Sequence, residues 1–142
     1  QQNGEWYNSV PPRGGVYDLV HAALSGTSTA ERLRAVVALG KSGDPRAVRP
    51  LTDLLGDTDT EIRLSATTAL GNLKSGRPVD ELAGRLRDRS EEMAIREQAA
   101  VALTAIRSTG ALREIREFVA DEDEDPVLRS YAGILLKDIG AV

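Results

Sequence analysis

The sequence contains no cysteine and a single histidine, His21. The lack of cysteine excludes disulfides, thiol nucleophiles and thiolate metal sites, and one histidine cannot build a multi-histidine metal centre. Aromatic residues make up only 4% of the chain, so a core must consist of aliphatic side chains. No apolar run approaches the ~20 residues that a membrane-spanning helix needs. The 18 Lys and Arg residues against 22 Asp and Glu argue against a general nucleic-acid binder, which should be basic.

The remaining composition describes one folded domain. The chain has 142 residues, of which 41% are hydrophobic and 28% charged, as is typical of a globular protein. Residues 1–15 differ because Asn, Gly, Pro and Ser punctuate them, and they hold the only tryptophan, Trp6, beside Tyr7. We expect a tail or linker over 1–15, one domain over 16–142, and a cytoplasmic location. Two alternatives stay open for Trp6 and Tyr7: they fold back over the first unit, or they belong to a linker remnant.

A repeat runs through the domain. Four segments carry an arginine, an alanine three residues later and a leucine seven residues later. They are Arg32-Ala35-Leu39, Arg63-Ala66-Leu70, Arg96-Ala99-Leu103 and Arg129-Ala132-Leu136. The arginines are 31, 33 and 33 residues apart, which predicts four similar units, over about 16–43, 44–76, 77–109 and 110–142.

Each unit is predicted to contain two helices. Upstream of the arginines, apolar residues recur at offsets 0, 3 and 7, as in Val48, Leu51 and Leu55, and this spacing places one apolar stripe on a helix. The first helices are expected over Val16–Ser25, Pro45–Leu55, Pro78–Arg87 and Ala111–Val119. The second helices are expected over Ala30–Lys41, Thr60–Lys74, Glu91–Arg107 and Pro126–Ile139. The later units have two additional residues, which fall in the charged loops before Met93 and Val127.

The segment from Ala38 to Leu51, Ala-Leu-Gly-Lys-Ser-Gly-Asp-Pro-Arg-Ala-Val-Arg-Pro-Leu, resembles the HEAT repeat in its phycocyanobilin lyase variant. Asp59-Thr60-Glu61-Ile62-Arg63 is similar to the start of that family's second helix, and the resemblance covers Val16 to Gly140. It implies an all-α fold, an α-solenoid of four stacked helix pairs, with about eight helices and with the second helices lining a concave surface.

The family resemblance also implies a structural role for the repeated arginines. In the family such arginines pair with the aspartate of the inter-helix turn and form a ladder between repeats. The members of this ladder here would be Arg32, Arg63, Arg96 and Arg129 with Asp57, Asp88 and Asp121. A row of anion-binding arginines is the weaker alternative, because repeated charges usually serve the repeat itself.

One face of the second helices carries little charge. At 100° per residue, the positions opposite the core lie one, five and eight residues after each arginine. The partner-binding residues expected on this concave face are Leu33, Val37, Leu64, Thr68, Glu97, Val101, Thr104, Ile134 and Lys137. The competing interpretation is that neighbouring second helices pack side by side and bury the same arc.

From these features we expect a protein that is not an enzyme, a scaffold that binds a peptide or protein segment along the concave face. We expect no cofactor and no metal, since the acidic run 121–125 lacks the ligand pattern of a calcium loop. The family's hydroxylases use several His–Glu pairs that this chain lacks, and no residue marks a tetrapyrrole site. The alternative function is an accessory or regulatory domain of a larger enzyme, such as a chromophore-lyase-like subunit. The apolar last helix favours a weak homodimer or a missing neighbouring domain, with no nucleic acid and no membrane as partner.

Overall fold

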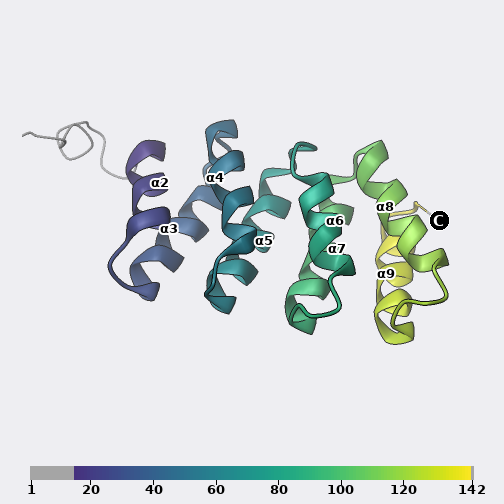
Figure 1. Ribbon diagram of the computed structural model, residues 1–142. Coiled ribbons are helices and arrows are strands. Elements are labelled where there is room, and N and C mark those ends of the chain that lie inside the picture. The colour runs from purple at the N-terminus through teal and green to yellow at the C-terminus, as the bar shows by residue number, and fades with distance from the viewer. Residues whose placement is uncertain (1–14, 142) are drawn as a thin grey trace, which may run out of the picture.

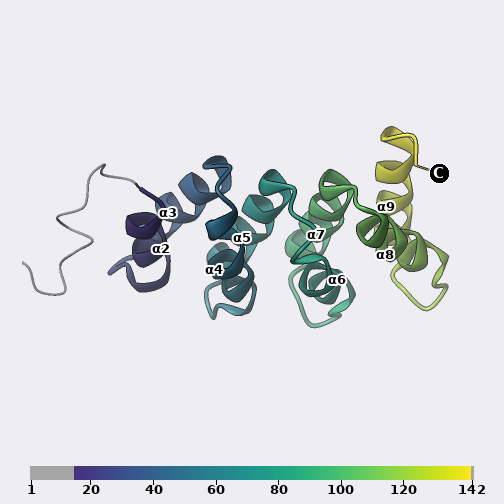
Figure 2. The same cartoon turned by 90° about the horizontal axis from the view of Figure 1, so that it is seen from above.

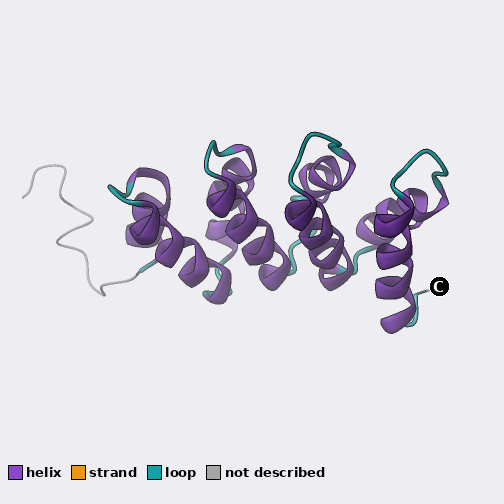
Figure 3. Ribbon diagram, turned by 90° about the horizontal axis from the view of Figure 1, so that it is seen from below, coloured by secondary structure: helices purple, strands orange, loops and turns teal. Residues whose placement is uncertain are grey.

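The computed structural model describes residues 15–141, which form four helix pairs arranged in a row (Figure 1). The first helices of the pairs are α2 (Val16–Ser25), α4 (Val48–Asp53), α6 (Val79–Arg87) and α8 (Thr109–Ala120). The second helices are α3 (Thr29–Lys41), α5 (Thr60–Leu73), α7 (Met93–Ile106) and α9 (Pro126–Asp138). Helices and loops account for all of residues 15–141, without a strand (Figure 3). The predicted all-α solenoid of stacked helix pairs is confirmed.

The helices form two layers. First helices lie on one side of the row and second helices on the other, as the view from above shows (Figure 2). The core lies between the layers, where the leucines of the repeat, Leu39, Leu70, Leu103 and Leu136, are buried. Leu51, Leu82 and Ile115 meet them from the first helices and are fully buried. A largely aliphatic core is therefore continuous along the row, and it also contains the fully buried ring of Phe118 on α8.

Helix α4 is shorter than the sequence predicted. The expected helix over Pro45–Leu55 is divided into a 3₁₀ turn η1 (Pro45–Ala47), α4 and a second 3₁₀ turn η2 (Leu54–Gly56). Pro50 lies inside this segment and has no N–H to donate to the carbonyl of Arg46, so a continuous α-helical ladder cannot form there.

Close contact between second helices depends on glycine. A Cβ atom on Gly40 of α3 would lie 2.7 Å from the Cβ of Ala69 on α5, and one on Gly71 would lie 3.0 Å from the Cα of Ala102 on α7. Between α7 and α9, Thr104 stands at the position of these glycines and Leu135 at the position of the alanines. Helix α9 packs less closely on α7 than α5 packs on α3 or α7. Small residues thus set the spacing of the first three second helices, and bulkier ones loosen the last junction.

This account predicts opposite effects for one substitution at two glycines. Gly40→Ala should lower the free energy of unfolding by about 1–3 kcal/mol, because the new methyl group meets the backbone of Ala69. Gly84→Ala, inside α6 with nothing within 4 Å, should raise it by up to about 1 kcal/mol through helix propensity. Urea unfolding measures both, and a stabilised Gly40→Ala protein would contradict the close approach.

Candidate functional site

Each repeated arginine first contacts its own helix pair. The Nε atoms of Arg32, Arg96 and Arg129 donate to the carbonyls of Ala23, Leu86 and Val119, each at 2.9 Å. These carbonyls lie near the end of a first helix, where no helical N–H is available to them. Arg63 instead donates from Nη1 to the carbonyl of Asp57 at 2.8 Å, in the turn that follows η2. The arginine thus closes the end of the first helix onto the second.

The guanidinium groups of the first three arginines also reach the next unit, whereas Arg129, in the fourth pair, makes only its contact with the Val119 carbonyl among residues 15–141. Arg32 pairs with Asp57 at 2.6 Å, Arg63 with Glu91 at 3.0 Å and Arg96 with Glu124 at 3.3 Å. Each of these acids lies in the inter-helix turn of the following pair. A ladder of ion pairs therefore links consecutive pairs along one edge of the row.

The sequence assigned the wrong acids to two of the three links. Asp88 and Asp121 accept the N–H groups of Ser90 and Asp123, at 2.9 and 3.0 Å, and thereby shape their own turns. Asp57 makes the same turn contact with Asp59 at 2.9 Å, but it faces Arg32 as well.

The physical reason is the length of the turns. Asp57 lies three residues before α5, whereas Asp88 and Asp121 lie five residues before α7 and α9. In the longer turns, the residue three positions after each aspartate is a glutamate. This glutamate faces the arginine of the preceding unit, as Asp57 does in the shorter turn. The spacing Asp-x-x-Glu in both longer loops was the signal that could have identified Glu91 and Glu124.

These glutamates are the centres of two buried charge clusters. The side chains of Glu91 and Glu124 are 3% and 5% exposed. Glu91 binds Arg85 at 3.1 Å as well as Arg63, and Glu124 lies within 4 Å of Arg89. A carboxylate removed from water in this way is stable only because it is surrounded by guanidinium groups.

The pKa values of these acids reflect the ladder. Burial would raise the pKa of Glu91, but hydrogen bonds from Arg63 and from the Glu92 N–H outweigh it and lower the pKa below its usual range. The side-chain hydrogen bond from Arg32 lowers the pKa of Asp57. Both acids are therefore held ionised in the folded chain.

The predicted concave-face residues differ in how far they are exposed. Leu33, Leu64 and Val101 are half-buried, whereas Val37, Thr68, Glu97, Ile134 and Lys137 are exposed. Thr104 is only 5% exposed and donates its hydroxyl to the carbonyl of Val101, so its inclusion as a partner contact is wrong. In α3, α5 and α7 the position eight residues after the arginine is buried against the next second helix, as Gly40 and Gly71 show, whereas Lys137 at this position of α9 is exposed. We define the second-helix face by the positions one and five residues after each arginine: Leu33, Val37, Leu64, Thr68, Glu97, Val101, Ser130 and Ile134.

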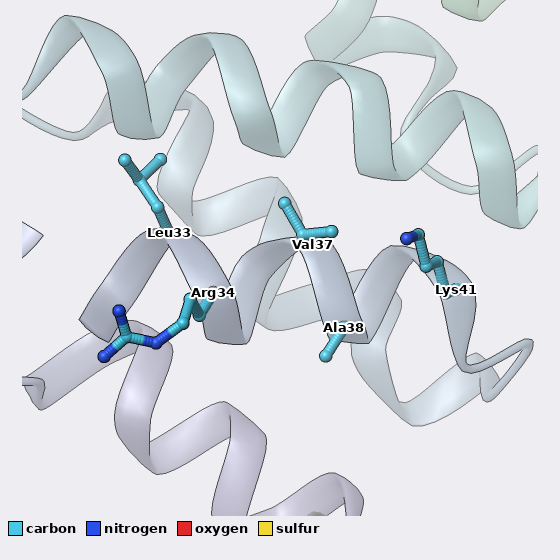
Figure 4. Close-up of a pocket in the computed structure, with 5 residues that line it drawn as sticks. All are labelled: Leu33, Arg34, Val37, Ala38 and Lys41. Carbon is cyan, nitrogen blue, oxygen red and sulfur yellow. The ribbon is translucent and has the colours of Figure 1, made fainter. Parts of the chain in front are cut away.

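A shallow hollow of about 370 Å³ lies on this face at α3. Leu33, Arg34, Val37, Ala38 and Lys41 line it, and Leu33, Val37 and Lys41 project from the same side of the helix (Figure 4). Its floor is apolar, and Arg34 and Lys41 supply positive charge at its edge. In residues 15–141 neither cation has a carboxylate partner.

Residues 15–141 offer few other groups for chemistry. Within the described part of the chain, no three His, Asp or Glu side chains are grouped so that they could hold a metal ion. The acidic run 121–125 contributes instead to the turn before α9, where Asp125 accepts the N–H of Leu128 at 2.8 Å. No helix between residues 15 and 141 has the length and apolar character needed to cross a membrane. Trp6 and Tyr7 lie outside the described residues.

The chain belongs to the HEAT-repeat family, whose model matches residues 17–93. Comparison with curated proteins finds no match. The fold is similar to human deoxyhypusine hydroxylase, solved in complex with glycerol, with 26% identity and a TM-score of 0.77 over 89% of this chain and 44% of that one. It is also similar to the complex of CpcE and CpcF of phycocyanin lyase from Nostoc, with 22% identity and a TM-score of 0.67 over 98% of this chain and 57% of that one. The chain thus spans less than two thirds of either structure's chain.

These similarities correct one prediction. The sequence led us to expect that the chain is not an enzyme, because it lacks cysteine, His–Glu pairs and a catalytic constellation. Both similar structures are enzymes by name, a hydroxylase and a lyase. Residue composition was therefore an insufficient ground for excluding catalysis, since the same fold carries it elsewhere.

The ladder predicts that equivalent arginine substitutions differ in cost. Arg96→Ala should lower the free energy of unfolding by about 3 kcal/mol, because it leaves the buried Glu124 without its closest partner. Arg49→Ala removes an exposed pair with Asp53 and should cost less than about 1 kcal/mol. Thermal unfolding compares the two, and equal melting temperatures would show that the arginine is not structural.

The lowered pKa values predict loss of stability in acid. Asp57 and Glu91 have lower pKa values in the folded chain than in the unfolded chain, so around pH 4 they are protonated mainly in the unfolded chain. The free energy of unfolding therefore falls as the pH drops below about 4. Melting temperatures between pH 3 and 6 test this, with Glu91→Gln as the control. That variant should be less stable at neutral pH but should lose less on acidification. An unchanged pH dependence in Glu91→Gln would contradict the assignment.

Proposed function

We propose that this chain binds a segment of a partner protein along the second-helix face. The observation that carries the proposal is the low charge of a face whose eight defining residues are all exposed or half-buried: only Glu97 among them is charged. Surfaces that stay in water are usually charged, whereas the centres of interfaces are depleted in charge. The first helices carry exposed charges of both signs, such as Arg49, Asp53 and Glu117, as a permanently solvated layer should.

The family and one similar structure support this proposal. Repeat solenoids present extended surfaces built from equivalent helices, which suit the binding of an elongated segment. The phycocyanin lyase structure is itself a complex of two chains, CpcE and CpcF. We take residues 16–142, in four units of about 16–43, 44–76, 77–109 and 110–142, as the binding domain and 1–15 as a tail or linker. A cytoplasmic location stays a prediction.

A second candidate function is that of a domain within a larger enzyme. This candidate is favoured by the lengths of the similar proteins, because this chain matches 44% of the hydroxylase chain and 57% of the lyase chain. A chromophore-lyase-like subunit would bind a tetrapyrrole and shift its absorbance, whereas a protein-binding domain alone would not. Titration of the chain into a tetrapyrrole solution therefore separates the two candidates.

Thr68→Glu tests the protein-binding proposal at the centre of the face. Thr68 is exposed, and within residues 15–141 its hydroxyl bonds only to the Leu64 carbonyl of its own helix at 3.2 Å, so the variant should stay folded. We expect a loss of affinity of at least about tenfold, because a charge is placed in a desolvated contact. The partner is recovered by pull-down from the native host, and the affinity is then measured with purified components by calorimetry.

Thr109→Glu is the matched control, since Thr109 is an exposed threonine at the start of α8 in the other layer. It should leave binding unchanged. If Thr68→Glu and Val101→Glu both stay folded and bind as tightly as the parent chain, the second-helix face is not the binding surface.

A further inference from the structure

The ends of the row differ from its middle in what they expose. We call four positions of each second helix its seam positions: two residues before the repeated arginine, and two, five and nine residues after it. At 100° per residue these positions fall within an arc of about 60° around the helix. On α3 these positions are Ala30, Arg34, Val37 and Lys41, and all four are exposed. Their spacing of four, three and four residues is that of the seam along which two parallel helices pack.

The same four positions on α9 hold Val127, Tyr131, Ile134 and Asp138, and all four are again exposed. Val127 and Ile134 are 74% and 54% exposed, which leaves an apolar stripe in water on the last helix. The equivalent residues on α5, such as Glu61, Ser65 and Thr68, are polar. The large apolar side chains exposed at these four positions are Val37 on α3 and Val127, Tyr131 and Ile134 on α9, whereas α7 exposes only the small side chains of Ala94 and Ala105 there. Helices α3 and α9 lie at opposite ends of the row (Figures 1 and 2).

We infer that α3 of one chain packs in parallel against α9 of a second copy, so that two chains form a symmetric dimer through their second helices. This contact shares only Val37 and Ile134 with the second-helix face, so it stands apart from the proposed function. In-register parallel helices bring equal seam positions together. Val37 then meets Ile134 of the second copy at the edge of the α3 hollow, and Ala30 leaves room for Val127 of the second copy. The contact covers Val127 and Ile134 of α9 with Ala30 and Val37 of α3.

Charge supports the choice of a second copy as the occupant. The last seam position pairs Lys41 with Asp138 of the second copy, two opposite charges that have no ion-pair partner within residues 15–141. Arg34 meets the ring of Tyr131 of the second copy, an arrangement that suits a cation–π contact. Because α3 and α9 lie in the same layer (Figure 2), a two-fold axis brings α3 and α9 of one chain against α9 and α3 of the other, and the assembly closes at two copies.

Charge reversal tests this pairing. Sedimentation of the chain over a range of concentrations should show a monomer–dimer equilibrium. Lys41→Glu and Asp138→Lys should each weaken dimerisation at least about tenfold, because each creates two like-charge contacts per dimer. Arg113→Glu, an exposed reversal on α8, should leave it unchanged.

The decisive sample is the mixture of the two impaired variants. In a mixed dimer, one seam pairs the unchanged Lys41 of one chain with the unchanged Asp138 of the other. In the second seam the introduced glutamate meets the introduced lysine. Both seams therefore keep opposite charges, and equimolar Lys41→Glu and Asp138→Lys chains should dimerise nearly as well as the parent. A parent chain that stays monomeric at high concentration, a mixture that stays monomeric, or growth beyond the dimer would overturn the inference. If the chain is monomeric but Thr68→Glu still abolishes binding of a foreign partner, only the dimer is wrong and the proposed function stands.

Discussion

The guanidinium group of the repeated arginine satisfies two groups that stacking helix pairs would otherwise leave without partners. One is the carbonyl at the end of the first helix, as between Arg96 and Leu86, and the other is a carboxylate from the next turn, as between Arg96 and Glu124. A planar group with five donors suits both contacts at once, which a lysine could not supply. Because one contact lies within a unit and the other crosses to the next, the side chain holds each helix pair closed and sets its position against its neighbour.

Helix spacing is the second constraint, and together the two determine what the second-helix face exposes. Gly40 and Gly71 let α3, α5 and α7 approach each other closely. Thr104 occupies the equivalent position where α7 faces α9, and it is buried there as well. The positions five residues after each arginine stay accessible, including Val37 and Ile134. The surface available to a partner is therefore narrower than the arc opposite the core, and its exposed large apolar side chains, Val37 and Ile134, lie on α3 and α9.

Periodicity predicted the fold because every unit must bury the same stripe, and four arginines in register fixed the helix pairs. The identity of the ladder acids could not be read in the same way. Two additional residues in a turn shift which side chain faces the arginine, so Glu91 and Glu124 replace Asp88 and Asp121 while those aspartates bind their own turns. Burial of Thr104 depended on the distance between helices, which a helical wheel does not contain. The exclusion of enzymatic activity failed because fold and composition do not determine chemistry.

A double-mutant cycle on Arg96 and Glu124 tests most directly whether the ladder couples neighbouring units. The free energy of unfolding is measured in urea for the parent chain, Arg96→Ala, Glu124→Ala and the double variant. If the two side chains stabilise the junction between the third and fourth helix pairs as one unit, the double variant should lose less than the sum of the single losses, with a coupling of about 1–3 kcal/mol. Additive losses, within about 0.3 kcal/mol, would contradict this account.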